Sequence, residues 1–164
     1  MTGIGWTSAR QRMIMAAAAA LLVGGSASAA PRTWDHVANI KTAAVHLSEL
    51  QKTRGALGAF EFIAACYQTH ELAEDFGAPL EACLVQDYIH SKLTAAIYAK
   101  LPAAERTRMG APSPEEMVAS MLRRFGGTFA RYKLKEADAR KLIADIDKHG
   151  IPEFTKARFP KKAE

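Results

Sequence analysis

The chain has 164 residues, of which 49% are hydrophobic and 24% charged, and its formal net charge at pH 7 is +5. This length fits one domain that buries about two-thirds of its unfolded surface and needs no metal to fold. The modest charge and the lack of an aromatic–basic motif argue against nucleic-acid binding. After the first thirty residues, no run approaches the ~18 apolar residues of a membrane span, so we expect the mature chain not to cross a membrane.

The first thirty residues have the three parts of a secretory signal peptide. Arg10 and Arg12 precede an uncharged apolar run at residues 13–23, which is too short for a membrane-spanning helix, and small residues follow it. Ala27 and Ala29 satisfy the A-x-A rule, so we predict cleavage after Ala29 and export of the remaining chain to the periplasm or beyond. The alternative is an uncleaved N-terminal anchor helix.

Two helices are predicted at the start of the mature chain, over residues 34–54 and 56–73. Their apolar residues recur at steps of three and four, and Thr33 is the expected N-cap of the first helix. Gly55 separates them, because glycine readily adopts the left-handed conformation that ends a helix. The pattern leaves open whether these are two helices or one helix kinked at Gly55.

Residues 79–101 form the most apolar predicted helix of the mature chain. Pro79 suits a first helical turn, and Pro102 stops the helix. Its apolar residues cover more than one face, which is typical of a helix contacted on two sides. We therefore expect this helix to lie at the centre of the domain.

Cys66 and Cys83 are the two cysteines of the chain. An even number of cysteines in an exported chain favours a disulfide. The two lack the C-x-x-C spacing of redox-active pairs, so we expect a structural bond. This bond would staple an antiparallel helical hairpin over residues 56–101 and stabilise it by about 3 kcal/mol.

The strongest helix-start signal of the chain lies at Ser113, Pro114 and Glu116. These residues match a capping box with proline in the first turn. They predict a helix that begins at residue 114, after a loop over residues 103–112, and that ends at Gly126 and Gly127. One or two further turns are expected over residues 129–134.

The last predicted helix covers residues 135–149 and ends at Gly150. Residues 151–164 contain two prolines and four basic residues. We expect them to form a basic C-terminal tail that docks through Phe154 and Phe159.

The predicted fold is all-α. No alternating β-strand pattern of useful length occurs. We expect a signal peptide at residues 1–29, one domain of about five helices at residues 30–150, and the tail at residues 151–164. The stapled hairpin lies at the centre of this domain, and no β-sheet is expected.

The histidines do not form a recognisable metal site. Zinc and copper ligands on a helix lie about one turn apart, a spacing shared by His70 with Glu74 and by Asp87 with His90. The hairpin register places these two pairs two turns or more apart. We therefore expect no metal and no other cofactor, and these four residues are weak metal candidates.

No catalytic motif is present, and in particular no G-x-S-x-G turn. Glu61 and Asp87 fall on apolar helices and are the acids to consider for an enzyme that acts on envelope polymers. We instead expect a non-enzymatic exported interaction or accessory protein. The alternative is a carrier that holds a small ligand or metal in a cavity between helices.

The C-terminal half of the chain is basic, since residues 101–164 carry fourteen basic and nine acidic residues. Such an excess favours an acidic protein or an anionic envelope surface as partner. The expected working surface is a helical groove or this basic half. Its candidate interaction residues are Arg123, Arg124, Arg131, Lys133 and Lys135.

Overall fold

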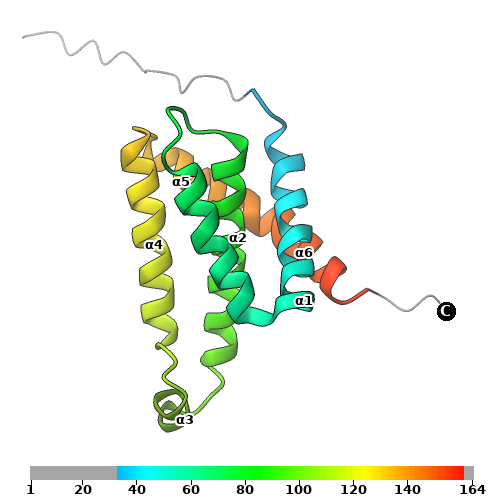
Figure 1. The fold of residues 1–164 in the computed structure, drawn as a ribbon, viewed down its shortest axis with the longest axis vertical. Helices are drawn as coiled ribbons and strands as arrows, with labels where there is room; N and C mark the ends of the chain where they lie inside the picture. The colour runs from blue at the N-terminus through cyan, green and yellow to red at the C-terminus, as the bar shows by residue number, and fades with distance from the viewer. Residues whose placement is uncertain (1–32, 161–164) are drawn as a thin grey trace, which may run out of the picture.

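The structure, a computed structural model, describes residues 33–160, and all of its regular elements in this range are helical. The prediction of an all-α domain is therefore confirmed (Figure 1). The predicted signal peptide lies outside the described residues, so cleavage after Ala29 stays a prediction. None of the helices in residues 33–160 combines the length and apolar character that a membrane-spanning segment needs.

The first helix, α1 (His36–His70), is bent back on itself at Gly55, whose backbone is not helical (φ 70°, ψ −175°). Its two limbs, residues 36–54 and 56–70, lie antiparallel, and the rings of His46 and Phe62 meet edge to face with centroids 5.0 Å apart. Residues 36–54 and 56–70 are thus two helical limbs that meet at the non-helical Gly55, which favours the two-helix alternative over one continuous helix. Asp35, not the predicted Thr33, caps α1, because its side chain accepts a 2.9 Å hydrogen bond from the Ala38 N–H.

We expect Gly55→Ala to lower the free energy of unfolding by about 2 kcal/mol, because this backbone conformation is nearly restricted to glycine. A Cβ at Gly55 would meet no atom within 4 Å, so the cost is conformational rather than steric. Gly126→Ala is the matched control. Gly126 is helical and has room for a Cβ, so this change should stabilise by about 0.5–1 kcal/mol. Urea unfolding followed by circular dichroism measures both, and equal effects would contradict the strain at Gly55.

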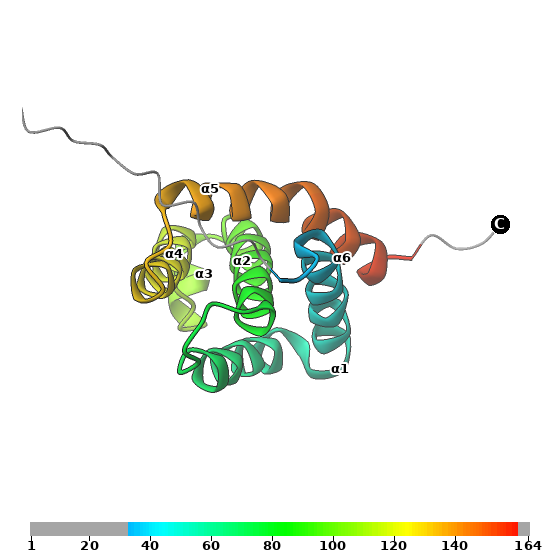
Figure 2. The same cartoon turned by 90° about the horizontal axis from the view of Figure 1, so that it is seen from above.

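The second helix, α2 (Ala78–Tyr98), lies at the centre of the fold. Every residue from 83 to 91 is buried, so α2 is covered on all sides along these turns. The view from above shows α2 surrounded by both limbs of α1, by α4 and by the run from α5 to α6 (Figure 2). The expected central helix is therefore confirmed.

The predicted disulfide joins the second limb of α1 to α2. Cys66 and Cys83 are bonded, with their Cα atoms 5.8 Å apart. Because Cys83 is buried and Cys66 half-buried, the bond lies at the contact between the two helices rather than on the surface. The stapled hairpin at the centre of the domain is thus present as predicted.

A short helix, α3 (Ala103–Arg108), replaces the loop that was predicted over residues 103–112. It begins directly after Pro102, which supplies the first acceptor: the N–H groups of Glu105 and Arg106 donate to the Pro102 carbonyl at 3.0 and 3.1 Å. The Arg106 Nη1 also donates to the carbonyls of Tyr98 and Leu101, at 3.2 and 2.5 Å. Arg106 thereby ties α3 to the end of α2.

The fourth helix, α4 (Pro114–Arg131), begins as predicted but does not end at Gly126 and Gly127. The capping box is present: Glu116 N–H donates to Ser113 Oγ at 3.1 Å, and Ser113 N–H donates to Glu116 Oε2 at 2.8 Å. Phe125 and Phe129 are buried on either side of the glycine pair. Their burial offsets the helix-weakening effect of two glycines, so α4 continues for another turn.

The last helices form one run: α5 (Glu136–Asp145), the π-helical turn η1 (Ile146–Gly150) and α6 (Ile151–Arg158). The run crosses α2 and the first limb of α1 (Figure 2). Residues 151–158 are therefore helical rather than a tail. Pro152 is accommodated in the first turn of α6. Phe154 docks into the core as expected, whereas Phe159 is 69% exposed.

Candidate binding site

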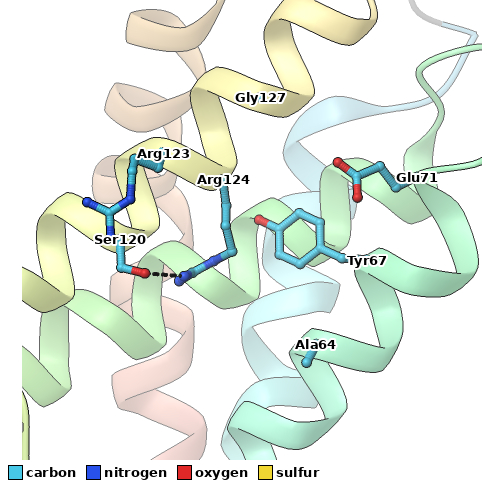
Figure 3. A pocket seen from close by; sticks show the side chains of 7 residues that line it. All are labelled: Ala64, Tyr67, Glu71, Ser120, Arg123, Arg124 and Gly127. Atoms are coloured by element: carbon cyan, nitrogen blue, oxygen red, sulfur yellow. Dashed lines mark hydrogen bonds between the residues drawn. The ribbon is translucent and has the colours of Figure 1, made fainter.

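The second limb of α1 and helix α4 flank one face of α2 and leave a groove with two adjoining hollows. The first hollow has a volume of 490 Å³ and lies between Tyr67 of α1 and Gly127 of α4 (Figure 3). The second has a volume of 380 Å³ and lies between Phe60 of α1 and Met117 of α4. The residues that line both hollows are Ser120, Arg123 and Arg124.

A buried carboxylate, Asp87 of α2, holds the two walls of the groove together. Arg124 donates to it twice, from Nε to Oδ2 at 2.7 Å and from Nη2 to Oδ1 at 2.6 Å. The hydroxyls of Tyr67 and Ser91 each donate to it at 3.0 Å. Asp87 is therefore a structural acceptor that links α1, α2 and α4, and its oxygens are occupied.

The surroundings of this carboxylate keep its donors protonated. Burial, followed by the negative charge of Asp87, raises the pKa of the Tyr67 hydroxyl well above its usual range. The hydrogen bonds to Asp87 raise the pKa of the Arg124 guanidinium. Tyr67 and Arg124 thus remain hydrogen-bond donors at any physiological pH, which suits a fixed link better than acid–base chemistry.

Arg123 is the cation that the groove leaves free. It is exposed where the two hollows meet, and no hydrogen bond or ion pair of its side chain occurs within residues 33–160. Its neighbourhood in sequence is one-sided in charge, since residues 117–135 contain five basic residues and no acidic residue. An anion entering the groove therefore meets an unpaired positive charge at its centre.

The other predicted interaction residues have different surroundings. Arg124 is half-buried and committed to Asp87, so it is not a free surface cation. Arg131, Lys133 and Lys135 are exposed beyond the groove, around the turn between α4 and α5. Of the five candidates, Arg123 is the one that is both exposed and part of the groove lining.

The weak metal candidates are not brought together. His70 is half-buried at the end of α1, and Glu74 is exposed in the following turn. Asp87 is occupied by Arg124, and His90 accepts a 3.2 Å hydrogen bond on Nδ1 from Gln51. Over residues 33–160, no group of three or more histidine, cysteine or acidic side chains is arranged to hold a metal ion.

The two acids considered for catalysis also have separate surroundings. Glu61 is exposed on α1, whereas Asp87 is buried and bonded to Arg124. Neither residue lines the two hollows of the groove. Glu61 and Asp87 therefore do not form a carboxylate pair in the groove.

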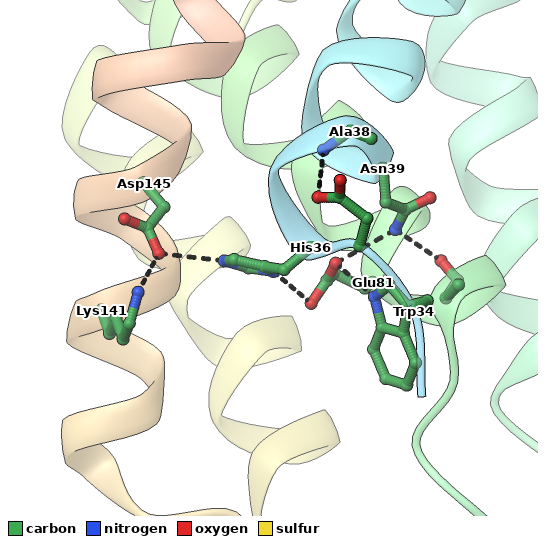
Figure 4. A network of polar contacts seen from close by, with 9 residues as sticks. Trp34, His36, Ala38, Asn39, Glu81, Lys141 and Asp145 are labelled. Atoms are coloured by element: carbon green, nitrogen blue, oxygen red, sulfur yellow. Dashed lines mark hydrogen bonds and ion pairs between the residues drawn. The ribbon is translucent and has the colours of Figure 1, made fainter. Parts of the chain in front are cut away.

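A second polar network, not predicted from the sequence, surrounds the buried Glu81 of α2 (Figure 4). Trp34 Nε1–H and Asn39 Nδ2–H donate to Glu81 Oε1 at 2.8 and 3.1 Å. His36 bridges two acids, with Nδ1 2.8 Å from Glu81 Oε2 and Nε2 3.0 Å from Asp145 Oδ2. This network anchors the start of α1 to α2 and α5.

Asp145 is held as a carboxylate in this network. Burial raises its pKa, but the hydrogen bonds from Lys141 and His36 outweigh burial and lower the pKa below its usual value. An acidic residue, Glu81, in the first turn of a largely apolar helix was the sequence signal for the network. Its partners could not be named, because they lie 42 to 47 residues away in the chain.

Comparison of the chain with protein-family models, with curated proteins and with solved structures finds no match in any of the three. A functional interpretation therefore depends on the chemistry of the groove itself. The feature that carries it is the exposed Arg123 at the junction of the two hollows. The other charged residues of the lining are Arg124, which is paired with Asp87, and the acids Glu71 and Glu116.

Proposed function

We propose that this chain is a non-enzymatic exported binding protein that takes an acidic polypeptide segment in the groove between the second limb of α1 and α4. The observation that carries the proposal is Arg123, a cation at the junction of the two hollows that has no partner among residues 33–160. It lies in a segment with five basic and no acidic residues. Such a field attracts acidic partners and raises their rate of association.

The groove combines this charge with apolar contact area. Phe60 on α1, which lines the second hollow, is a large apolar side chain that is 47% exposed. Interfaces commonly place an arginine beside apolar and aromatic side chains that exclude water from it. An acidic segment with some apolar residues therefore matches both features.

The covalent chemistry of the chain supports export as the setting. A disulfide persists in oxidising compartments and is rare in the cytosol, and Cys66–Cys83 is such a bond. This agrees with the signal peptide predicted at residues 1–29. We therefore expect the partner to be located outside the cytosol as well.

The proposal predicts salt-sensitive binding of polyglutamate that depends on Arg123. In fluorescence anisotropy with a labelled polyglutamate peptide, Arg123→Glu should weaken binding about tenfold or more at low salt, since it replaces attraction with repulsion. Raising the salt from about 0.05 to about 0.5 M should weaken wild-type binding strongly.

Lys41→Glu is the matched control, because Lys41 is an exposed cation of α1 outside the groove lining. It makes the same change in net charge and should have a much smaller effect. Binding that is insensitive to salt, or that Lys41→Glu weakens as much as Arg123→Glu, would rule out the groove as the binding surface.

A further inference from the structure

Part of the lining of the second hollow is apolar. Phe60 of α1, Met117 of α4 and Pro112, just before α4, all line it. Its volume of 380 Å³ is that of a small-ligand site. These three apolar residues can accommodate a short hydrocarbon group.

A buried histidine contributes an unused hydrogen-bond donor to this hollow. His90 is 4% exposed and is one of the residues that line the hollow. Burial lowers the pKa of His90, so the ring is neutral at neutral pH. Since Gln51 Nε2–H donates to Nδ1, the single ring proton resides on Nε2, which has no hydrogen-bond partner within the described part of the chain.

Two further donors lie on α4. Ser120 Oγ accepts a 2.8 Å hydrogen bond from Arg124 Nη1, which leaves the Ser120 hydroxyl hydrogen free to donate (Figure 3). Arg123 lines the same hollow and makes no side-chain hydrogen bond or ion pair with any other described residue. The acid of the hollow, Glu116, is engaged by the Ser113 N–H in the capping box.

We infer that the hollow between Phe60 and Met117 recognises a carboxylate attached to an apolar group, with His90, Ser120 and Arg123 as the donors to its oxygens. A carboxylate has acceptors only and carries one charge, which matches three donors of which one is cationic. The apolar group lies between Phe60 and Met117. This inference rests on the proposed function, because it names the chemical group of the acidic partner that occupies this part of the groove.

The test titrates the oxidised protein with octanoate and, separately, with octan-1-ol, which lacks the carboxylate. Long-range proton–nitrogen NMR spectra of the imidazole rings report the result at His90 itself. We expect octanoate to shift the His90 Nε2 signal, and Arg123→Gln to weaken octanoate binding about tenfold while leaving octan-1-ol binding unchanged. Lys41→Gln is the matched control and should leave both unchanged.

A second variant checks the location of the apolar group. Met117→Trp fills the hollow from α4 and should abolish octanoate binding without removing a donor. A short peptide that ends in leucine, with a free or an amidated C-terminus, distinguishes the source of the carboxylate. Tighter binding of the free peptide than of octanoate indicates a polypeptide C-terminus, and the reverse indicates a free amphiphilic acid.

The outcomes separate this inference from the proposed function. If polyglutamate binds through Arg123 while neither octanoate nor the free peptide moves the His90 signal, the inference is wrong and the proposed function stands. If octanoate binds as expected and polyglutamate does not, the polypeptide partner is wrong and the carboxylate site stands. Equal affinity of octanoate and octan-1-ol would also overturn the inference.

Discussion

Arg124→Ala is expected to lower the free energy of unfolding by about 3 kcal/mol or more. The reason is that the substitution would leave the buried carboxylate of Asp87 without its cationic partner. Asp87 is fully buried, and Arg124 donates two of its four hydrogen bonds. Removing one partner of a buried ion pair costs about 3–5 kcal/mol, because the other charge is left without compensation.

The adjacent residue offers a strict control. Arg123 precedes Arg124 on the same helix, is exposed and has no partner in the described structure, so Arg123→Ala should change stability by no more than about 0.5 kcal/mol. Denaturant unfolding followed by circular dichroism measures both variants. In a double-mutant cycle, Asp87→Ala should remove most of the penalty of Arg124→Ala. Equal and small losses for both arginines would contradict the role given to the Asp87–Arg124 pair.

Replacing both cysteines by alanine should have the second large effect. We expect it to lower the free energy of unfolding by about 3 kcal/mol. Cys66 and Cys83 are 17 residues apart, and closing a loop of this size restricts the unfolded chain by about that free energy. Burial of Cys83 adds to the loss, because alanine leaves space in the core. The second limb of α1 should be affected most, since the bond ties it to α2.

Hydrogen exchange locates this effect along the chain. Amides of residues 56–70 should lose more protection than those of α2 in the double variant. Wild-type protein treated with a reductant should behave in the same way, which controls for the change in side-chain size. If reduced and oxidised wild type unfold at the same denaturant concentration, the staple contributes little and the prediction is wrong.

The groove explains why two arginines that are adjacent in sequence have separate roles. Arg124 points towards α2, where it binds Asp87, whereas Arg123 lies where the two hollows meet (Figure 3). The stability and binding experiments should therefore give opposite rankings. Arg124→Ala is expected to affect unfolding more, and Arg123→Glu is expected to affect polyglutamate binding without a comparable loss of stability.

Much of the fold could be predicted from the sequence because its signals are local. Ser113 and Glu116 are three residues apart, and both bonds of their capping box are present. Helical periodicity likewise acts over one or two turns and placed the central helix correctly. The disulfide is the one long-range contact that could be predicted. The chain has two cysteines, so a single pairing is possible.

The misplaced helix ends have a common cause. Gly126 and Gly127 weaken a helix locally, and Gly150 with Pro152 resembles a stop signal. In the folded chain α4 continues because Phe125 and Phe129 are buried around the glycines, and α6 forms because Phe154 enters the core. Burial of these rings stabilises the helices by more than glycine and proline destabilise them. A sequence pattern does not show which rings will be buried.

The sequence by itself determined the helical class, the strongest helix start, the disulfide and the presence of basic residues at positions 123 and 124. Only the tertiary structure decided which of these arginines is free, because that depends on Asp87, which lies 37 residues from Arg124. It also decided that His36 bridges to Asp145, which lies 109 residues away, and that His90 lines a hollow with Phe60 and Met117. Side chains this far apart meet only through packing around α2, so their contacts leave no local pattern in the chain.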